Sequence, residues 1–148
     1  MKKLIELRIV YLAVLAGIFL LAMAQAAPAI QSETCGFRGM CWGAPVEDLG
    51  PRELIERQKG PPDITVYRKP DERLSYGRAR LADITYGFTD SRMTSVTLRV
   101  NSYLQYLFMK EKAFAEFGEG VQVQDKPDDY TWSGNNVQVA LVSNFKKT

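Results

Sequence analysis

The spacing of apolar residues changes along the chain, and each change marks an expected element. Residues 64–68 are rich in β-branched and aromatic side chains behind a Gly-Pro-Pro-Asp breaker at 60–63, which predicts a strand. Residues 82–88 alternate apolar with polar side chains, the period-two pattern of a strand with one buried face. Residues 96–100 repeat that alternation after a candidate hairpin turn at 90–92. This part of the chain therefore predicts antiparallel strands.

A period of three to four residues follows, which predicts one long amphipathic helix. Asn101 or Ser102 is an acceptable N-cap, and Gly118 or Gly120 can end the helix in a left-handed conformation. The apolar residues expected to form its buried face are Leu104, Leu107, Phe108, Phe114 and Phe117.

The remaining segments are shorter and carry weaker patterns. Residues 35–43 fit a first strand or a tight loop, 45–49 a helical turn, and 52–58 a resumption of that helix. After the long helix, strands are expected near 121–123, 130–132 and 137–141, with a turn at 133–136 joining the last two. Strands thus occur in consecutive runs, which favours an α+β fold, mainly an antiparallel sheet with the long helix packed on one face.

The N-terminus resembles an export signal. Lys2, Lys3 and Arg8 precede an apolar run at 9–24, and small residues at 24–26 suit a signal peptidase. We therefore expect a signal peptide at 1–26, a linker at 27–34 and a single α+β domain at 35–148. The alternative is that residues 1–26 stay as an uncleaved anchor helix, since the run approaches the length of a short transmembrane span.

Charge bears on the class of partner. The chain has 19 Lys and Arg against 17 Asp and Glu, and residues 1–26 hold three of these bases and one of the acids. The remainder therefore carries 16 of each sign. A neutral domain lacks the positive excess that nucleic-acid binding needs, so no nucleic-acid partner is expected.

The two cysteines, Cys35 and Cys41, are expected to form a disulfide if the protein is exported to an oxidising compartment. A disulfide requires Cα atoms about 4.4 to 6.8 Å apart, so the chain must turn between the two residues. Gly36 and Gly39 make such a turn feasible. If residues 37–42 instead form a straight strand, the two thiols are unpaired within the chain.

The sequence contains no histidine, which limits the catalytic mechanisms that the chain can use. Ser-His-Asp and Cys-His catalysis are excluded within this chain. The cysteine spacing does not match the C-x-x-C motif of thiol redox enzymes. The carboxylate pairs Glu47/Asp48 and Asp128/Asp129 fit a helix start and a solvated turn better than a catalytic pair. We therefore expect no catalytic residues, no bound metal and no cofactor.

Three motifs resemble a set of short exported proteins of unknown function from Gram-negative bacteria. They are the F-x-G-x-x-W-G opening at 37–43, the I-x-Y-x-F strand at 84–88 leading to Ser95-Val96, and the Y-x-W at 130–132. The resemblance covers nearly all of the chain after the signal segment. It implies an envelope α+β domain and supplies no catalytic residues. A fainter similarity in size and layout links the chain to outer-membrane assembly lipoproteins and β-lactamase inhibitor proteins.

The function expected from these observations is a non-enzymatic, exported envelope protein that binds another envelope protein. Periplasmic location is expected, with an inner-membrane anchor and a periplasmic domain as the alternative; membrane contact is expected only if residues 1–26 are uncleaved. The aromatic residues that fall off the apolar faces, and so are candidate partner contacts, are Tyr76, Tyr103 and Tyr106.

Two alternative functions remain open at this point. One is a carrier or sensor of a small apolar molecule, held between the helix that bears Leu107 and Phe114 and the strand that bears Ile84 and Tyr86. The other is an enzyme that works without histidine.

Overall fold

The computed structural model describes residues 35–144, so the expected signal or anchor segment at 1–26 and the linker at 27–34 lie outside the described residues. Within 35–144, no helix has the length and apolar content needed to cross a membrane.

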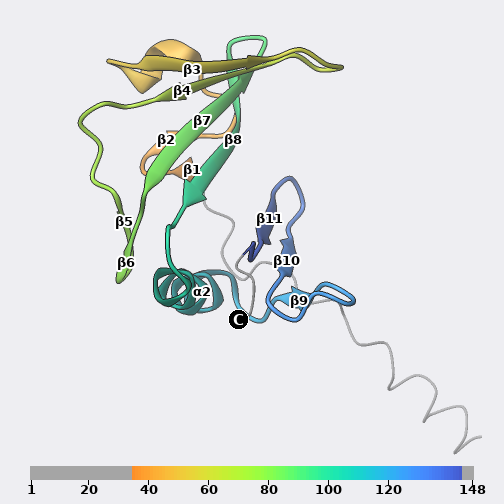
Figure 1. Ribbon diagram of the computed structural model, residues 1–148. Helices are drawn as coiled ribbons and strands as arrows, with labels where there is room; N and C mark the ends of the chain where they lie inside the picture. Colours follow the sequence, from red (N-terminus) through yellow and green to blue (C-terminus); the bar gives the residue numbers. More distant parts are fainter. Residues whose placement is uncertain (1–34, 145–148) are drawn as a thin grey trace, which may run out of the picture.

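The fold is α+β, as predicted: its sheets are antiparallel, and they are accompanied by one α-helix and one short 3-10 helix within residues 35–144 (Figure 1). In chain order the elements are β1 (Gly36–Phe37), β2 (Met40–Cys41), η1 (Val46–Leu49), β3 (Glu53–Gln58), β4 (Ile64–Arg68), β5 (Ser75–Tyr76), β6 (Ala79–Arg80), β7 (Asp83–Thr89), β8 (Arg92–Arg99), α2 (Tyr103–Phe117), β9 (Val121–Gln122), β10 (Tyr130–Ser133) and β11 (Gln138–Leu141).

The strands are divided between separate sheets, whereas the sequence suggested a single one. The largest sheet has the order β3-β4-β7-β8, a second has the order β11-β10-β9, and β1-β2 and β5-β6 form two small hairpins. Figure 1 shows the four-stranded sheet at one end, with α2 and the β9–β11 sheet at the other. The three strands after the helix are joined by short connections and pair with one another, which costs less loop-closure entropy than returning to the larger sheet.

Strand β7 provides the centre of the core. Ile84, Tyr86 and Phe88 are each at most 2% exposed, which confirms the buried face that the alternation predicted. Thr85, on the opposite face, is also buried. The same core cluster continues into α2 and β10 through Tyr106 and Trp132.

Helix α2 begins and ends where the sequence predicted, but buries a different face. Ser102 accepts a hydrogen bond from the backbone N–H of Gln105, and Gly118, with φ 84°, ends the helix. The buried residues are Tyr106, Met109 and Ala113. These three positions also follow helical spacing. Periodicity alone therefore could not decide whether they or the larger apolar side chains nearby form the buried face.

Two of the residues predicted for the buried face are on the surface. Leu104 is 55% exposed and Leu107 is 40% exposed. Phe114, by contrast, packs edge-on against Tyr130 and Trp132, with ring centroids 5.1 and 5.4 Å apart. The buried face is therefore rotated toward the β9–β11 sheet.

The segment 52–58, expected to resume a helix, is instead the edge strand β3. Gly50 ends η1 with φ 72°, and Pro51 follows it. All six residues of β3 are exposed, so this strand carries no buried apolar face that sequence periodicity could report. Its backbone pairing with β4 decides its conformation. A bulge interrupts the pairing of β3 between Leu54 and Glu56, and the strand carries charged side chains. Both features are typical of edge strands that avoid pairing with strands of other molecules.

Gly120 allows β10 to pack against the end of α2. A Cβ at this position would lie 2.7 Å from Cε2 of Trp132, whose indole Nε1 donates to the carbonyl of Gly118. We predict that Gly120→Ala lowers the free energy of unfolding by about 1–3 kcal/mol, because the buried indole must shift. Urea unfolding measures this, with Gly60→Ala as control, since the nearest atom there lies 3.8 Å away. Equal effects of the two substitutions would contradict the packing.

A bidentate ion pair joins β4 to β7. Arg68 Nε and Nη2 lie 2.7 and 2.9 Å from the two carboxylate oxygens of Asp83, and Arg99 is the cross-strand partner of Asp83. The hydrogen bonds from Arg68 lower the pKa of Asp83, and the positive charges of Arg68 and Arg99 add to this effect.

This lowered pKa predicts a pH-dependent contribution to stability. A carboxylate with a depressed folded-state pKa stabilises the protein above its unfolded pKa of about 3.9, and that stability is lost as the pH falls through the folded value. The stability advantage of the wild type over Asp83→Asn should therefore be present at pH 7 and shrink steadily below about pH 4. Asp90→Asn, at the exposed β7–β8 turn, is the matched control. A constant difference between wild type and Asp83→Asn from pH 7 to pH 2 would contradict this.

Candidate functional site

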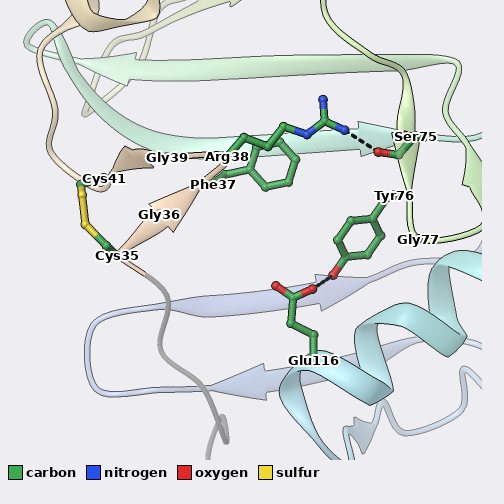
Figure 2. A pocket seen from close by; sticks show the side chains of 10 residues that line it. All are labelled: Cys35, Gly36, Phe37, Arg38, Gly39, Cys41, Ser75, Tyr76, Gly77 and Glu116. Carbon is green, nitrogen blue, oxygen red and sulfur yellow. Dashed lines mark hydrogen bonds between the residues drawn. A yellow bond between two sulfur atoms is a disulfide. The ribbon is translucent and has the colours of Figure 1, made fainter.

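The N-terminal hairpin β1–β2 turns at Arg38 and Gly39. Both residues have positive φ, 50° and 81°, which matches the two-residue hairpin turn that follows the twist of the strands. This turn brings the Cα atoms of Cys35 and Cys41 within 4.8 Å, and a disulfide joins them (Figure 2). The expected disulfide is confirmed, and its presence is consistent with an oxidising compartment.

Arg38 fastens the tip of this hairpin to the body of the protein. Its Nη1 donates to Oε1 of Glu72 at 3.0 Å and to the carbonyl of Arg73 at 2.6 Å, and its Nη2 donates to the carbonyl of Ser75. The guanidinium also lies 5.2 Å from the centroid of the Phe37 ring. The hairpin is thus held at its base by the disulfide and at its tip by Arg38.

Glu72 receives this contact from inside the protein. Its side chain is only 7% exposed, and its Oε1 also accepts a hydrogen bond of 2.5 Å from the hydroxyl of Tyr86. Burial raises the pKa of Tyr86, and the bond to Glu72 raises it further, so the hydroxyl remains a donor at neutral pH. The second oxygen, Oε2, is buried and has no hydrogen-bond partner among residues 35–144.

A cavity of about 460 Å³ lies on one side of the hairpin, and we call it the tyrosine cavity (Figure 2). Tyr76, from β5, and Glu116, from α2, point toward one another there, and the Tyr76 hydroxyl donates to Glu116 Oε2 at 2.9 Å. Burial raises the pKa of Tyr76, as does this bond. The full lining is Cys35, Gly36, Phe37, Arg38, Gly39, Cys41, Ser75, Tyr76, Gly77 and Glu116.

A second cavity of about 250 Å³, the glutamate cavity, lies against the same hairpin. Its charged residues are Arg38, Asp48, Lys69 and Glu72, two of each sign. Phe37, Met40 and Leu49 are among its apolar walls. Four residues line both cavities: Phe37, Arg38, Gly39 and Cys41. The two cavities and the hairpin that they share form one continuous feature, which we call the hairpin site.

A third cavity, of about 340 Å³, is lined by residues 125–129 and 142–144. Its most buried carboxylate, Asp129, is engaged locally: Oδ1 accepts from the backbone N–H of Ser143, and Oδ2 lies 3.9 Å from Lys126 Nζ. Across residues 35–144, no group of three or more Cys, Asp or Glu side chains is arranged to hold a metal ion.

The three tyrosines expected to contact a partner lie in different environments. Tyr76 is partly buried and lines the tyrosine cavity. Tyr103 is 41% exposed at the start of α2 and stacks on Tyr106, with ring centroids 5.6 Å apart. Tyr106 is 1% exposed and donates to the carbonyl of Asp128, and burial raises its pKa. Tyr106 therefore belongs to the core rather than to a contact surface.

The residues that organise the hairpin site were not predicted from the sequence. Glu72 lies in a Pro-Asp-Glu-Arg turn, where a carboxylate is ordinarily solvated, and Glu116 lies among the charges of the helix. Arg38 carried one usable signal, because an X-Gly pair between two closely spaced cysteines suggests a tight turn. The sequence around each of these residues gives no sign that the three segments come together in the fold.

Comparison with protein-family models, with curated proteins and with solved structures found no significant match to this chain. The resemblance to short exported envelope proteins therefore stays a prediction.

The anchoring role of Arg38 has a direct consequence for stability. Arg38→Ala removes one partner of a buried carboxylate, so we predict a loss of about 1–3 kcal/mol in the free energy of unfolding. The matched control is Arg57→Ala, on the exposed edge strand β3, for which we expect a change within about 0.5 kcal/mol. Urea unfolding of both variants with the disulfide intact measures the difference. Equal stability of the two variants would show that Arg38 does not hold the hairpin.

Proposed function

We propose that this chain is an exported, non-catalytic protein-binding module of the cell envelope and that the hairpin site is its contact surface. The observation that carries the proposal is the fixed hairpin together with the two cavities that it lines. In this proposal the protein acts in the periplasm, or on its periplasmic side if residues 1–26 remain as an anchor.

Preorganisation favours this use of the hairpin. The disulfide and the three hydrogen bonds of Arg38 restrict the hairpin before any partner arrives. Binding to a fixed surface loses less conformational entropy than binding to a segment that must become ordered. The left-handed turn at Arg38 and Gly39 is likewise already formed.

The residue types at the site suit protein contacts. Arginine and aromatic residues carry a large share of the binding energy in protein interfaces, and here Arg38, Phe37 and Tyr76 lie together. The cavities, of about 460 and 250 Å³, have room for anchoring side chains of a partner.

The apolar-carrier alternative gains less support. Its site required Leu107 and Phe114 to face Ile84 and Tyr86 across a cavity. Leu107 is 40% exposed, and Phe114 packs against Tyr130 and Trp132. Neither side chain lines any of the three cavities described above. The histidine-independent enzyme gains no support from Asp129, one member of the Asp128/Asp129 pair. Its Oδ1 accepts from the backbone N–H of Ser143, and its Oδ2 lies 3.9 Å from Lys126 Nζ.

Site-specific photocrosslinking in the native cell tests this proposal. A photoreactive amino acid is placed at one position at a time. Ser75 lines the tyrosine cavity and Lys69 lines the glutamate cavity. Arg57, on the exposed strand β3, is the control. We expect Ser75 and Lys69 to crosslink to the same polypeptide and Arg57 to give no such product. Products of similar yield at all three positions, or none at any with the protein correctly exported, would contradict the proposal.

A further inference from the structure

The tyrosine cavity contains a carboxylate with one oxygen still free to accept a hydrogen bond. Glu116, on α2, accepts the hydroxyl of Tyr76 at Oε2, and Lys112 Nζ lies 3.3 Å from the same oxygen. Figure 2 shows the other oxygen, Oε1, turned away from Tyr76, on the side of Cys35 and Gly36. No residue within 35–144 donates a hydrogen bond to Oε1.

This free oxygen can be reached from the cavity. Within the described part of the chain, Glu72 Oε2 is the only side-chain oxygen that is both buried and without a hydrogen bond, so Glu116 Oε1 keeps accessible surface. The Glu116 side chain is 26% exposed and lines the tyrosine cavity. A donor that enters the cavity can therefore bind Oε1 without displacing Tyr76.

The other walls of the cavity suit a planar ring. Phe37 and Tyr76 contribute aromatic rings, against which another ring packs favourably in an offset or edge-on arrangement. Three lining residues, Gly36, Gly39 and Gly77, place no side chain in the cavity. Its volume of about 460 Å³ lies within the range of about 300–1,000 Å³ that is usual for ligand pockets.

The charges around the cavity favour a neutral donor. Lys112 already neutralises the Glu116 carboxylate in part, and Arg38 also lines the cavity, so a cationic ligand would face two positive groups. An anionic ligand would be repelled by Glu116. Tyr and Trp side chains combine an apolar ring with a neutral O–H or N–H donor, and so meet both requirements of the cavity.

The lining that the two cavities share favours a polypeptide over a free small molecule. Phe37, Arg38, Gly39 and Cys41 border the glutamate cavity as well as the tyrosine cavity. A polypeptide that places one ring in the tyrosine cavity can therefore extend across the hairpin and make further contacts. A free phenol or indole would be confined to the one cavity.

We infer that the tyrosine cavity binds a Tyr or Trp side chain of the partner polypeptide, with the ring against Phe37 and Tyr76 and its O–H or N–H donated to Glu116 Oε1. This inference rests on the proposed function and adds to it the chemistry of the recognised residue.

The test uses a random peptide library displayed on phage and selected on the full-length, oxidised protein. We expect the selected peptides to share one Tyr or Trp. In the synthetic peptide, replacing this Tyr by Phe, or this Trp by 1-methyltryptophan, keeps the ring and removes the donor. Binding should weaken about tenfold to a hundredfold, because the lost hydrogen bond is to a charged group. These substitutions leave the protein unchanged.

Variants of the protein locate the effect. Glu116→Leu removes the acceptor and keeps a good helix former, so the preference for the peptide with the donor should disappear. Glu111→Leu is the matched control, because Glu111 is also an exposed glutamate of α2 and lines none of the three cavities. There the preference should persist. Circular dichroism and mass measurement confirm the fold and the disulfide of each variant.

The contrary outcomes separate this inference from the proposed function. The inference is wrong if no peptide is enriched, if the enriched peptides share no Tyr or Trp, or if Glu116→Leu keeps the wild-type preference. Binding of free p-cresol or indole as tightly as the peptides would also overturn it, since the polypeptide would then add nothing. The proposed function is tested independently: photocrosslinks from Ser75 and Lys69 to one polypeptide would support it even if the ring were not recognised in this way.

Discussion

The contact between Arg38 and Glu72 organises the part of the protein to which we assign function. A buried carboxylate needs a compensating charge or hydrogen bonds, and Glu72 obtains them from Arg38 and Tyr86. Tyr86 belongs to the central strand of the core, so the hairpin is connected through Glu72 to the most buried element of the fold. The second carboxylate oxygen, Oε2, is buried and has no hydrogen-bond partner among residues 35–144.

The elements with a regular pattern and a buried face could be predicted from the sequence. The alternation around Ile84 and Tyr86, the caps at Ser102 and Gly118, and the paired cysteines all report local constraints, and all are confirmed. Strand β3 could not be predicted because its six residues are exposed and its conformation comes from pairing with β4. Partition of the strands into separate sheets depends on which strands pair with one another, which composition and period do not encode.

The candidate site was less accessible to sequence reasoning than the fold. Its chemistry arises where a hairpin at residues 35–41, a turn at 70–73 and the end of a helix near residue 116 come together. Each segment is ordinary when considered alone: a tight turn, a solvated loop and a helix surface. Aromatic content drew attention to Tyr76, which lines the site, and to Tyr106, which the fold uses in its core. Only the tertiary arrangement distinguishes the two.

The central claim of this account is that the hairpin is rigid before any partner binds. Backbone amide order parameters from nuclear magnetic resonance of the oxidised, full-length protein measure this directly. The account predicts values for Phe37, Met40 and Cys41 that match those of β7, about 0.85, because the disulfide and Arg38 restrain both ends of the hairpin. Values below about 0.6 at these residues, with β7 rigid, would show a flexible hairpin and contradict the claim.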